Sequence, residues 1–443
     1  MRWRRIPRYL TIAIAAASAW PAPAVAAPAT HQETDRAGAS GTAAVARAIA
    51  DEAGGWLKRF YKDRGYRPLW VSGGRIGPQA ATLIGYLRSA GLDGLKPSSY
   101  DIDDLSEAVA KARGGDPELV ARAELALSRA FADYVRDQRR PPALHVIYAD
   151  PKLKPKRPKR EEVLRAAAFP KSFADYVADM GWMSAQYVQL RDLAARAQKA
   201  GASDAELERL ALNLDRARIL PGPWTRHIVV DASSGRLWYY EAGRQVGTMR
   251  VVVGAAATQT PMLVGTLQWT VLNPYWNVPT YLAREKIAPK VLAGRSLAAM
   301  HMEVLSDWSA SAREIPASSI DWHAVAAGTE EIRLRELPGP ANSMGRVKFI
   351  FPNDEGIYLH DTPVRALLQK NDRHFSNGCI RLENAAALGR WLLQRPLPKP
   401  NPKQPEKAVP LPVPVPVYLT YITATATKTG LAFRDDVYGR DKG

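Results

Sequence analysis

The chain of 443 residues holds a single cysteine, Cys379, with a histidine, His360, upstream of it. One cysteine excludes an intrachain disulfide framework, a cysteine-rich zinc site and a CxxC redox pair. A thiol attacks efficiently only as the thiolate, so a nucleophilic cysteine needs an imidazole or a helix N-terminus beside it. His360 supplies the imidazole, and a helix predicted over 383–393 supplies the positive helix end. The pair indicates covalent catalysis, and a buried, inert cysteine is the alternative.

Strands must position this pair. Short β-branched or aromatic runs separated by turn residues predict an antiparallel sheet folded into a sandwich or barrel. A strand ending at His360 and a glycine turn at Gly378 would present the two side chains. The strand runs are 226–231, 236–241, 245–253, 267–272, 347–351, 356–360 and 417–424.

The first half of the chain has a different pattern. From about residue 43 to 222, apolar residues recur at helical spacing, and the period changes to that of strands at Pro221-Gly222-Pro223. The basic run 152–160 is predicted to be a solvated loop. We therefore expect an α+β multidomain protein, with a mostly helical scaffold domain at 43–222 and a mainly β catalytic domain at 223–443.

Two segments interrupt the catalytic domain. A helical capping insertion is predicted over 280–340, opening with a capped helix at Thr280. The stretch 396–416 carries nine prolines and is predicted to be an extended loop with no packed core.

The N-terminus predicts export. Residues 1–26 combine a basic start, an apolar run and small residues before a cleavage point, which is typical of a signal peptide; an uncleaved membrane anchor is the alternative. No other segment is long and apolar enough to span a bilayer, so we expect an exported protein without a stable membrane span. Removing the four arginines of 1–26, which contain no acidic residue, lowers the formal charge from +17 to 17 − 4 = +13.

The residues around the cysteine resemble those of the L,D-transpeptidase family (YkuD-type catalytic domain). The resemblance implies an enzyme that crosslinks peptidoglycan in the bacterial cell envelope or periplasm. The likeness is to the larger branch with a helical scaffold and a capping insertion. One departure is Asn377, where the family commonly has histidine. Another is the lack of a separate peptidoglycan-binding module between scaffold and catalytic domain. The matching segments are 272–279, 338–340, 345–349, 358–363, 375–381 and 433–436.

The resemblance implies a mechanism. Cys379 would attack the carbonyl of the third residue of a tetrapeptide stem, a diamino acid, and release the terminal D-alanine; the side-chain amine of a second stem would then resolve the thioester. His360 would act as base and acid, held by the backbone carbonyl of Asp361, whose carboxylate either helps or only stabilises the turn. The amides of Gly378 and Cys379 are the predicted oxyanion donors.

Five residues are predicted to bind substrate, and four of them have a structural alternative. Arg381 would meet a substrate carboxylate or form a salt bridge within the site. Tyr358 and Trp276 would border the groove or lie in the core, and Ser376 would contact substrate or brace the turn. Asn377 would donate a hydrogen bond.

Partners and cofactors follow from the same residues. The expected partners are peptidoglycan stem peptides and carbapenem-type inhibitors, which would acylate the same sulfur. We expect no nucleic acid partner, because no reading module is present. We also expect no cofactor and no metal, because the seven histidines form no HExxH or comparable ligand pair.

Besides the transpeptidase, a second and a third hypothesis stay open. The same thioester chemistry with water as acceptor gives an L,D-carboxypeptidase, and with a protein amine it attaches proteins to the wall or releases them. A third hypothesis is a non-catalytic wall-binding scaffold. Intact His360 and Cys379 argue against it, and Asn377 argues faintly for it.

Overall fold

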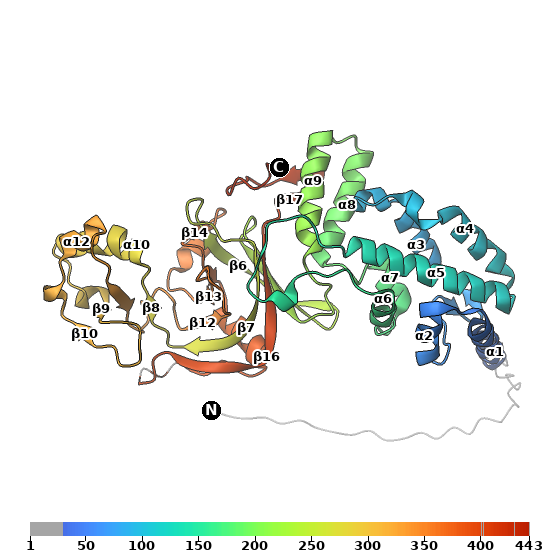
Figure 1. Ribbon diagram of the computed structural model, residues 1–443, viewed down its shortest axis with the longest axis horizontal. Helices are drawn as coiled ribbons and strands as arrows, with labels where there is room; N and C mark the ends of the chain where they lie inside the picture. Colours follow the sequence, from blue (N-terminus) through green and yellow to red (C-terminus); the bar gives the residue numbers. More distant parts are fainter. Residues whose placement is uncertain (1–29, 400, 402, 429, 443) are drawn as a thin grey trace, which may run out of the picture.

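Three parts follow one another along the long axis of the molecule: a helical N-terminal part, a sheet-rich middle part and a small capping part (Figure 1). The computed structural model describes residues 30–399, 401, 403–428 and 430–442. The predicted signal peptide, residues 1–26, lies outside the described residues.

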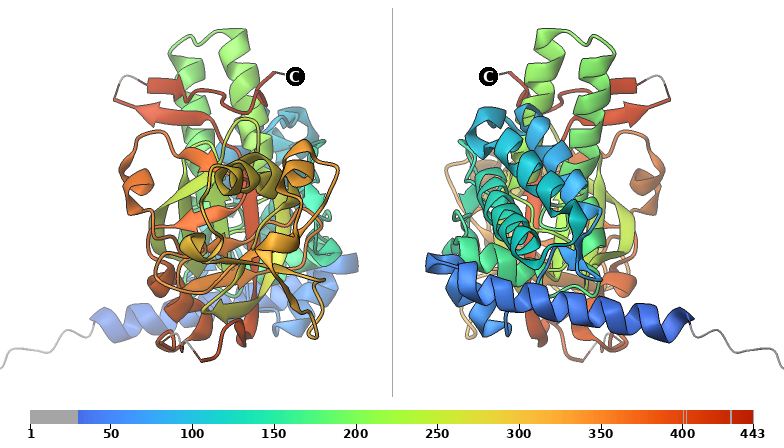
Figure 2. Two further views of the ribbon diagram at one scale, coloured as in Figure 1. Left: turned by 90° about the vertical axis from the view of Figure 1, so that its left-hand side faces the viewer. Right: turned by 90° about the vertical axis from the view of Figure 1, so that its right-hand side faces the viewer.

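The N-terminal part is helical, as predicted. Helix α5 is its centre, and α1 lies across one end of the domain (Figure 2). The helix α5 begins where the side chain of Asp116 accepts hydrogen bonds from the amides of Glu118 and Leu119. In the described residues, no helix has the length and apolar character needed to cross a bilayer. The helices are α1 Thr30–Glu52, α2 Gly55–Asp63, α3 Gln79–Arg88, α4 Ile102–Lys111, α5 Pro117–Gln138, α6 Arg160–Ala167, α7 Phe173–Ala178, α8 Ala185–Lys199 and α9 Asp204–Arg218.

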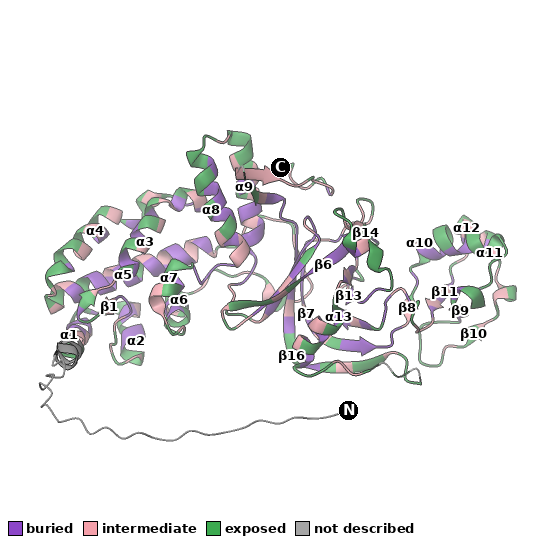
Figure 3. Cartoon of the chain, turned by 180° about the vertical axis from the view of Figure 1, so that it is seen from behind, coloured by how far each residue is buried: buried purple, intermediate pink, exposed green. Residues whose placement is uncertain are grey.

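The middle part is a closed barrel, with buried residues along its strands (Figure 3). Eight strands pair in the ring order β12-β13-β15-β6-β5-β4-β16-β7, and β12 closes the ring because it pairs with both β13 and β7. The strands are β4 His227–Asp231, β5 Arg236–Glu241, β6 Arg244–Gly254, β7 Leu263–Leu272, β12 Val347–Ile350, β13 Leu359–His360, β15 Ile380–Leu382 and β16 Lys407–Thr420.

The predicted strands are present, but the expectation of an antiparallel sheet is only partly right. The pairs β13–β15 and β4–β16 are parallel. Two more short strands also pair in parallel with the barrel: β3 (Ile147–Tyr148), from the helical part, with β7, and β14 (His374–Ser376) with β6. Each parallel partner is reached by a connection longer than a hairpin, so hairpin spacing in the sequence could not reveal it.

The prediction of a proline-rich loop over 396–416 is wrong for its second half. Residues 407–416 belong to β16, which runs antiparallel to β7. Proline is tolerated at bulges and where one side of a strand has no partner. Both conditions hold here, because the register with β7 is interrupted between Pro410 and Val415, and β4 pairs with β16 only from Val417 onward.

The capping part is more than the predicted helical insertion. It has the expected helices, α10 (Thr280–Leu282), α11 (Ala288–Leu292) and α12 (Trp322–Ala327), and a hydrophobic core of its own. It also has a four-stranded antiparallel sheet in the order β10-β9-β11-β8, which we did not predict because its strands are only two to four residues long. These strands are β8 Trp276–Asn277, β9 Met302–Leu305, β10 Glu314–Ile315 and β11 Arg333–Glu336.

The C-terminal tail fastens the helical part to the barrel. The chain enters the hairpin of β17 (Ala424–Thr427) and β18 (Gly430–Phe433) beside helix α9. There the buried side chain of Asn213 accepts hydrogen bonds from the amides of Thr423 (2.7 Å) and Ala424 (3.2 Å).

We predict that Asn213→Ala lowers the free energy of unfolding by about 2–4 kcal/mol, because it leaves two buried N–H groups without an acceptor. Urea denaturation followed by circular dichroism measures the change. Asn371→Ala, at an exposed position, is the matched control and should change stability by less than about 0.5 kcal/mol. Equal stability of the two variants would contradict this account of the tail.

Candidate active site

Parallel pairing of β13 with β15 assembles the candidate site. Leu359 pairs with Ile380 and His360 with Arg381, and the amide of Ile380 donates to the carbonyl of Tyr358 (3.0 Å). Successive side chains of a strand alternate between its faces. Because Leu359 and Ile380 are fully buried in the barrel core, the other face carries the predicted site side chains Tyr358, His360, Cys379 and Arg381.

The ring of His360 is held in one tautomer. Its Nδ1 lies 2.6 Å from the backbone carbonyl oxygen of Asp361. A carbonyl only accepts, so Nδ1 carries the proton and Nε2 keeps a free electron pair. The imidazole is thus oriented as a base, and the position of the Asp361 carbonyl agrees with the prediction.

The carboxylate of Asp361 serves a different purpose. It accepts hydrogen bonds from the amide of Arg346 (3.0 Å) and from the guanidinium of Arg365 (2.6 Å). A Cβ at Gly345, where φ is +63°, would lie 2.5 Å from this carboxylate. The carboxylate therefore stabilises a tight turn, and Asp361 contacts His360 only through its backbone.

Cys379 follows a turn that requires glycine. Gly378 has φ of +105°, a conformation that side chains disfavour. The half-buried thiol of Cys379 donates to the carbonyl of Gly356 at 3.5 Å. Within the described part of the chain, no hydrogen bond joins this sulfur to His360, so the resting thiol and the base share a face without being engaged.

Hydrogen bonds inside the turn change the predictions for two residues. The buried hydroxyl of Ser376 donates to the carbonyl of Cys379 (2.6 Å) and accepts from the amide of Gly378 (3.2 Å). Ser376 therefore braces the turn and is not placed to bind substrate. The amide of Gly378, predicted as an oxyanion donor, already has an acceptor. From outside the turn, the hydroxyl of Thr260 donates to the carbonyl of Gly378 (2.7 Å).

Electrostatics keep both reacting groups neutral. Burial raises the pKa of Cys379 to about 11, although hydrogen bonds from the backbone and hydroxyl of Tyr358 and the charge of Arg381 oppose the rise. Burial and the charges of Arg381 and Lys348 lower the pKa of His360 to about 3. Lys348, His360 and Arg381 form a row across β12, β13 and β15, so a cation flanks the imidazole on each side.

The two cations differ in their partners. The ammonium of Lys348 lies 2.6 Å from the carboxylate of Glu406. Arg381 has no ion pair among the described residues, and its buried Nε has no hydrogen-bond partner there. The alternative prediction of a structural salt bridge for Arg381 is therefore wrong, and its guanidinium is free to meet an anionic ligand.

Aromatic side chains surround the sulfur. Tyr358 is half-buried, and its ring meets His360 edge-on, with the ring centres 5.9 Å apart. Tyr281, on α10 of the capping part, was not predicted. Burial raises the pKa of Tyr281, and the nearby charge of the Cys379 thiolate adds to the rise, so the cap reaches the site. The only signal in the sequence was its position in the first turn of the predicted cap helix.

The structure also gives the positions of three further residues that the sequence analysis considered for the site. Asn377 is exposed beside Cys379 and remains a predicted substrate contact. Trp276 lies on β8 and packs against the core of the cap. His374, which we did not assign to the site, braces a turn through Asp372 (2.5 Å) and the carbonyl of Ala232 (2.9 Å).

The predicted helix does not stabilise the thiolate. Helix α13 (Ala385–Leu393) begins after Asn384, whose side chain caps it, and strand β15 separates it from Cys379. The three extended residues of β15 alone span about 10 Å. Because the effect of a helix end fades within about one turn, the sulfur lies beyond its reach. In the described ranges, no three His, Cys, Asp or Glu side chains are grouped to hold a metal ion.

Family models match most of the chain. The model of the L,D-transpeptidase catalytic domain matches residues 225–412, and that of a scaffold domain matches residues 55–193. A Haemophilus influenzae protein named "Putative L,D-transpeptidase" is 27% identical over 341 residues, which cover 76% of this chain and 67% of that protein.

Solved structures with partial similarity include two L,D-transpeptidases. One from Mycobacterium smegmatis is 12% identical with a TM-score of 0.22, and 44% of this chain matches 58% of that one. A mutant from Enterococcus faecium is 11% identical with a TM-score of 0.20, and 56% of this chain matches 89% of that one. The match thus spans less than two thirds of the mycobacterial chain.

We predict that alkylation of Cys379 by iodoacetamide accelerates about tenfold per pH unit from pH 7 to pH 10, because the thiolate fraction grows in that proportion below a pKa near 11. His360, with its pKa near 3, carries no charge in this range to stabilise the thiolate. Mass spectrometry measures the rate, and Cys379→Ser provides the unlabelled control. A plateau of the rate between pH 5 and pH 8 would contradict the neutral pair and indicate a thiolate–imidazolium pair.

Proposed function

This chain belongs to the L,D-transpeptidase family, and from that membership we propose that it is an exported enzyme that crosslinks peptidoglycan through a thioester on Cys379. The observation that carries the proposal is the shared face of β13 and β15. On that face, the sole thiol lies near a histidine whose Nδ1 is fixed by the carbonyl of Asp361 and whose Nε2 is free to take a proton.

In the first half-reaction, rotation about the Cα–Cβ bond turns the thiol of Cys379 from the Gly356 carbonyl toward Nε2 of His360. Nε2 takes the thiol proton as the sulfur attacks the carbonyl carbon of the third stem residue. The bond from that carbon to the nitrogen of the terminal D-alanine then breaks. The imidazolium returns its proton to the departing amine, which leaves a thioester on Cys379.

In the second half-reaction, an amine of another stem attacks the thioester carbon and loses a proton to Nε2 of His360. The carbon–sulfur bond breaks, and the sulfur recovers the proton as the new amide forms. Each half-reaction passes through an oxyanion. We assign its stabilisation to the hydroxyl of Tyr358 and the amide of Cys379, because the amide of Gly378 donates to Ser376.

Arg381 is the proposed anchor for the donor stem. Its guanidinium lies next to the reacting pair and has no ion pair in the described ranges, so a substrate carboxylate would complete its coordination. A bound carboxylate would also offset the positive charge that disfavours protonation of His360. The base would thus become stronger when the donor binds.

The remaining proposals concern context. We place the protein in the periplasm or envelope of a bacterium, because residues 1–26 have the pattern of a signal peptide. Without residues 1–26 the formal charge is 17 − 4 = +13, which favours an anionic polymer as partner. Carbapenems are proposed to acylate Cys379, since they present a strained carbonyl to the same nucleophile.

Incubation of the purified protein with tetrapeptide-stem muropeptides should yield crosslinked dimers and free D-alanine, as read by mass spectrometry. Cys379→Ala should abolish both products and keep the circular dichroism spectrum unchanged. Tripeptide monomers without dimers would indicate an L,D-carboxypeptidase instead. Unchanged substrate with retained binding would favour a wall-binding scaffold, and crosslinking by Cys379→Ala at the native rate would refute the nucleophile.

We predict that Arg381→Gln raises KM for the donor stem about tenfold or more, because a charge-assisted hydrogen bond contributes about 1.5–3 kcal/mol. KM and kcat are measured separately with D-alanine release as the signal. Arg390→Gln, at an exposed position of α13, is the matched control and should leave KM unchanged. An unaltered KM in Arg381→Gln would remove this residue from substrate binding.

A further inference from the structure

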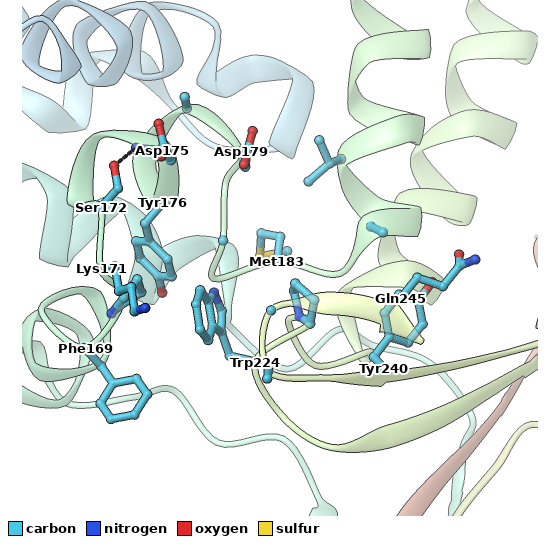
Figure 4. Close-up of a pocket in the computed structure, with 18 of the residues that line it drawn as sticks. Phe169, Lys171, Ser172, Asp175, Tyr176, Asp179, Met183, Trp224, Tyr240 and Gln245 are labelled. Atoms are coloured by element: carbon cyan, nitrogen blue, oxygen red, sulfur yellow. Dashed lines mark hydrogen bonds between the residues drawn. The ribbon is translucent and has the colours of Figure 1, made fainter. Parts of the chain in front are cut away.

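A cavity lies between the scaffold and the barrel, away from the candidate active site. It has a volume of about 1030 Å³. Segments around α7 and α8 form one wall, and the hairpin of β5 and β6 forms the other (Figure 4). No residue that lines it belongs to β13, β15 or the capping part, so the mechanism proposed above does not use it.

Two exposed aromatic side chains mark this cavity. Phe169 is 82% exposed and Trp224 is 42% exposed, and their ring centres lie 6.5 Å apart. The indole of Trp224 packs directly on the turn between β5 and β6, because a Cβ at Gly243 would lie 2.9 Å from it. The ring is therefore held in place while much of its surface stays open. Exposed, fixed aromatic rings are costly in water and typical of binding sites.

Several polar groups of the cavity lack partners among the described residues. The carboxylates of Asp175, Asp179 and Asp192 and the ammonium of Lys171 form no ion pair within the described ranges. Beside them, Gln186 donates its amide to the hydroxyl of Tyr240 (2.9 Å). Its own carbonyl oxygen is buried without a hydrogen-bond partner among the described residues. Donors and acceptors are thus left for a ligand.

The cavity continues along the junction. A smaller cavity of about 300 Å³ shares Gln189, Asp192, Tyr240 and Gln245 with it. The two together form an elongated groove that begins at the aromatic pair and passes Gln186, the shape expected for a segment of a polymer.

We propose that this groove binds the glycan strand of peptidoglycan, an inference that rests on the proposed function for its choice of polymer. Sugar rings offer apolar C–H faces to stack on Trp224 and Phe169. Their hydroxyl and acetamido groups donate hydrogen bonds to carboxylates and amides. The larger cavity carries three carboxylates and one lysine, whereas Arg196 and Arg434 line the smaller one, so the aromatic end of the groove is the part that disfavours acidic stem peptides, although the chain as a whole is strongly basic.

Such a site supplies what a separate peptidoglycan-binding module would supply. A strand held at the scaffold keeps its stem peptides near Cys379 and raises their effective concentration there. The groove therefore contributes to reaction with polymeric substrate and contributes nothing to reaction with free stem peptides.

Isothermal titration calorimetry with chitotetraose, a tetramer of N-acetylglucosamine, tests the proposal on the full chain. We expect saturable binding by the native protein and binding about tenfold weaker in Trp224→Ala, equivalent to about 1.4 kcal/mol. Phe169→Ala should also weaken binding, and because Phe169 is highly exposed, this variant should keep the native fold. The matched control is Trp308→Ala, whose tryptophan is 47% exposed on the capping part, and it should bind like the native protein.

Activity separates this proposal from the proposed function. Trp224→Ala should crosslink intact glycan strands at least about fivefold more slowly and free tetrapeptide stems at the native rate. If chitotetraose did not bind, or bound equally to all variants, the proposed glycan site would be overturned. Crosslinking of free stems by the native protein would still support the proposed enzymatic function. Binding of a glycan-free stem peptide in the groove, abolished by Trp224→Ala, would also overturn it. Chitotetraose binding without any crosslinking would instead refute the proposed function.

Discussion

The parallel pairing of two very short strands, β13 and β15, is the constraint on which the candidate site depends. Two register pairs, Leu359 with Ile380 and His360 with Arg381, decide which side chains face the site and which enter the core. A shift by one residue would turn His360 inward and expose Leu359. Such short strands specify little by themselves. Their register is fixed because β12 and β6 pair on either side and the ring is closed.

The same register explains the unusual charge state of the site. It places the imidazole of His360 between the cations of Lys348 and Arg381, and of these two only Lys348 has a counter-ion, Glu406, among the residues that the structure describes. A buried imidazole next to an uncompensated guanidinium stays neutral, and a buried thiol stays protonated. The resting site is therefore unreactive, which protects the lone thiol from oxidation. An anionic ligand on Arg381 would supply the missing negative charge.

Local signals in the sequence predicted most of the fold and the centre of the site. Helical periodicity, turn residues and β-branched runs identified the scaffold and the strands β4 to β7, and the residues around Cys379 identified the family. Features that depend on distant contacts were missed. The four cap strands are too short to show alternation. The prolines of β16 favoured the prediction of a loop, and its pairing with β7, which is distant in sequence, could not be recognised from the local pattern. Tyr281 influences Cys379 from the capping part, a proximity that depends on the tertiary fold.

The turn from Ser376 to Cys379 is connected to the scaffold through residues of the C-terminal tail. Thr260 holds the carbonyl of Gly378, and the amide of Thr260 in turn meets the hydroxyl of Tyr438 (3.3 Å) in the C-terminal tail. Three residues beyond Tyr438, the carboxylate of Asp441 is paired with Arg216 of α9 at 2.6 Å. Polar contacts, joined by the backbone from Tyr438 to Asp441, thus link a scaffold helix to the residue that precedes the thiol. Movement of α9 would therefore be transmitted through these contacts to the turn, so the position of Cys379 depends on the scaffold as well as on the barrel.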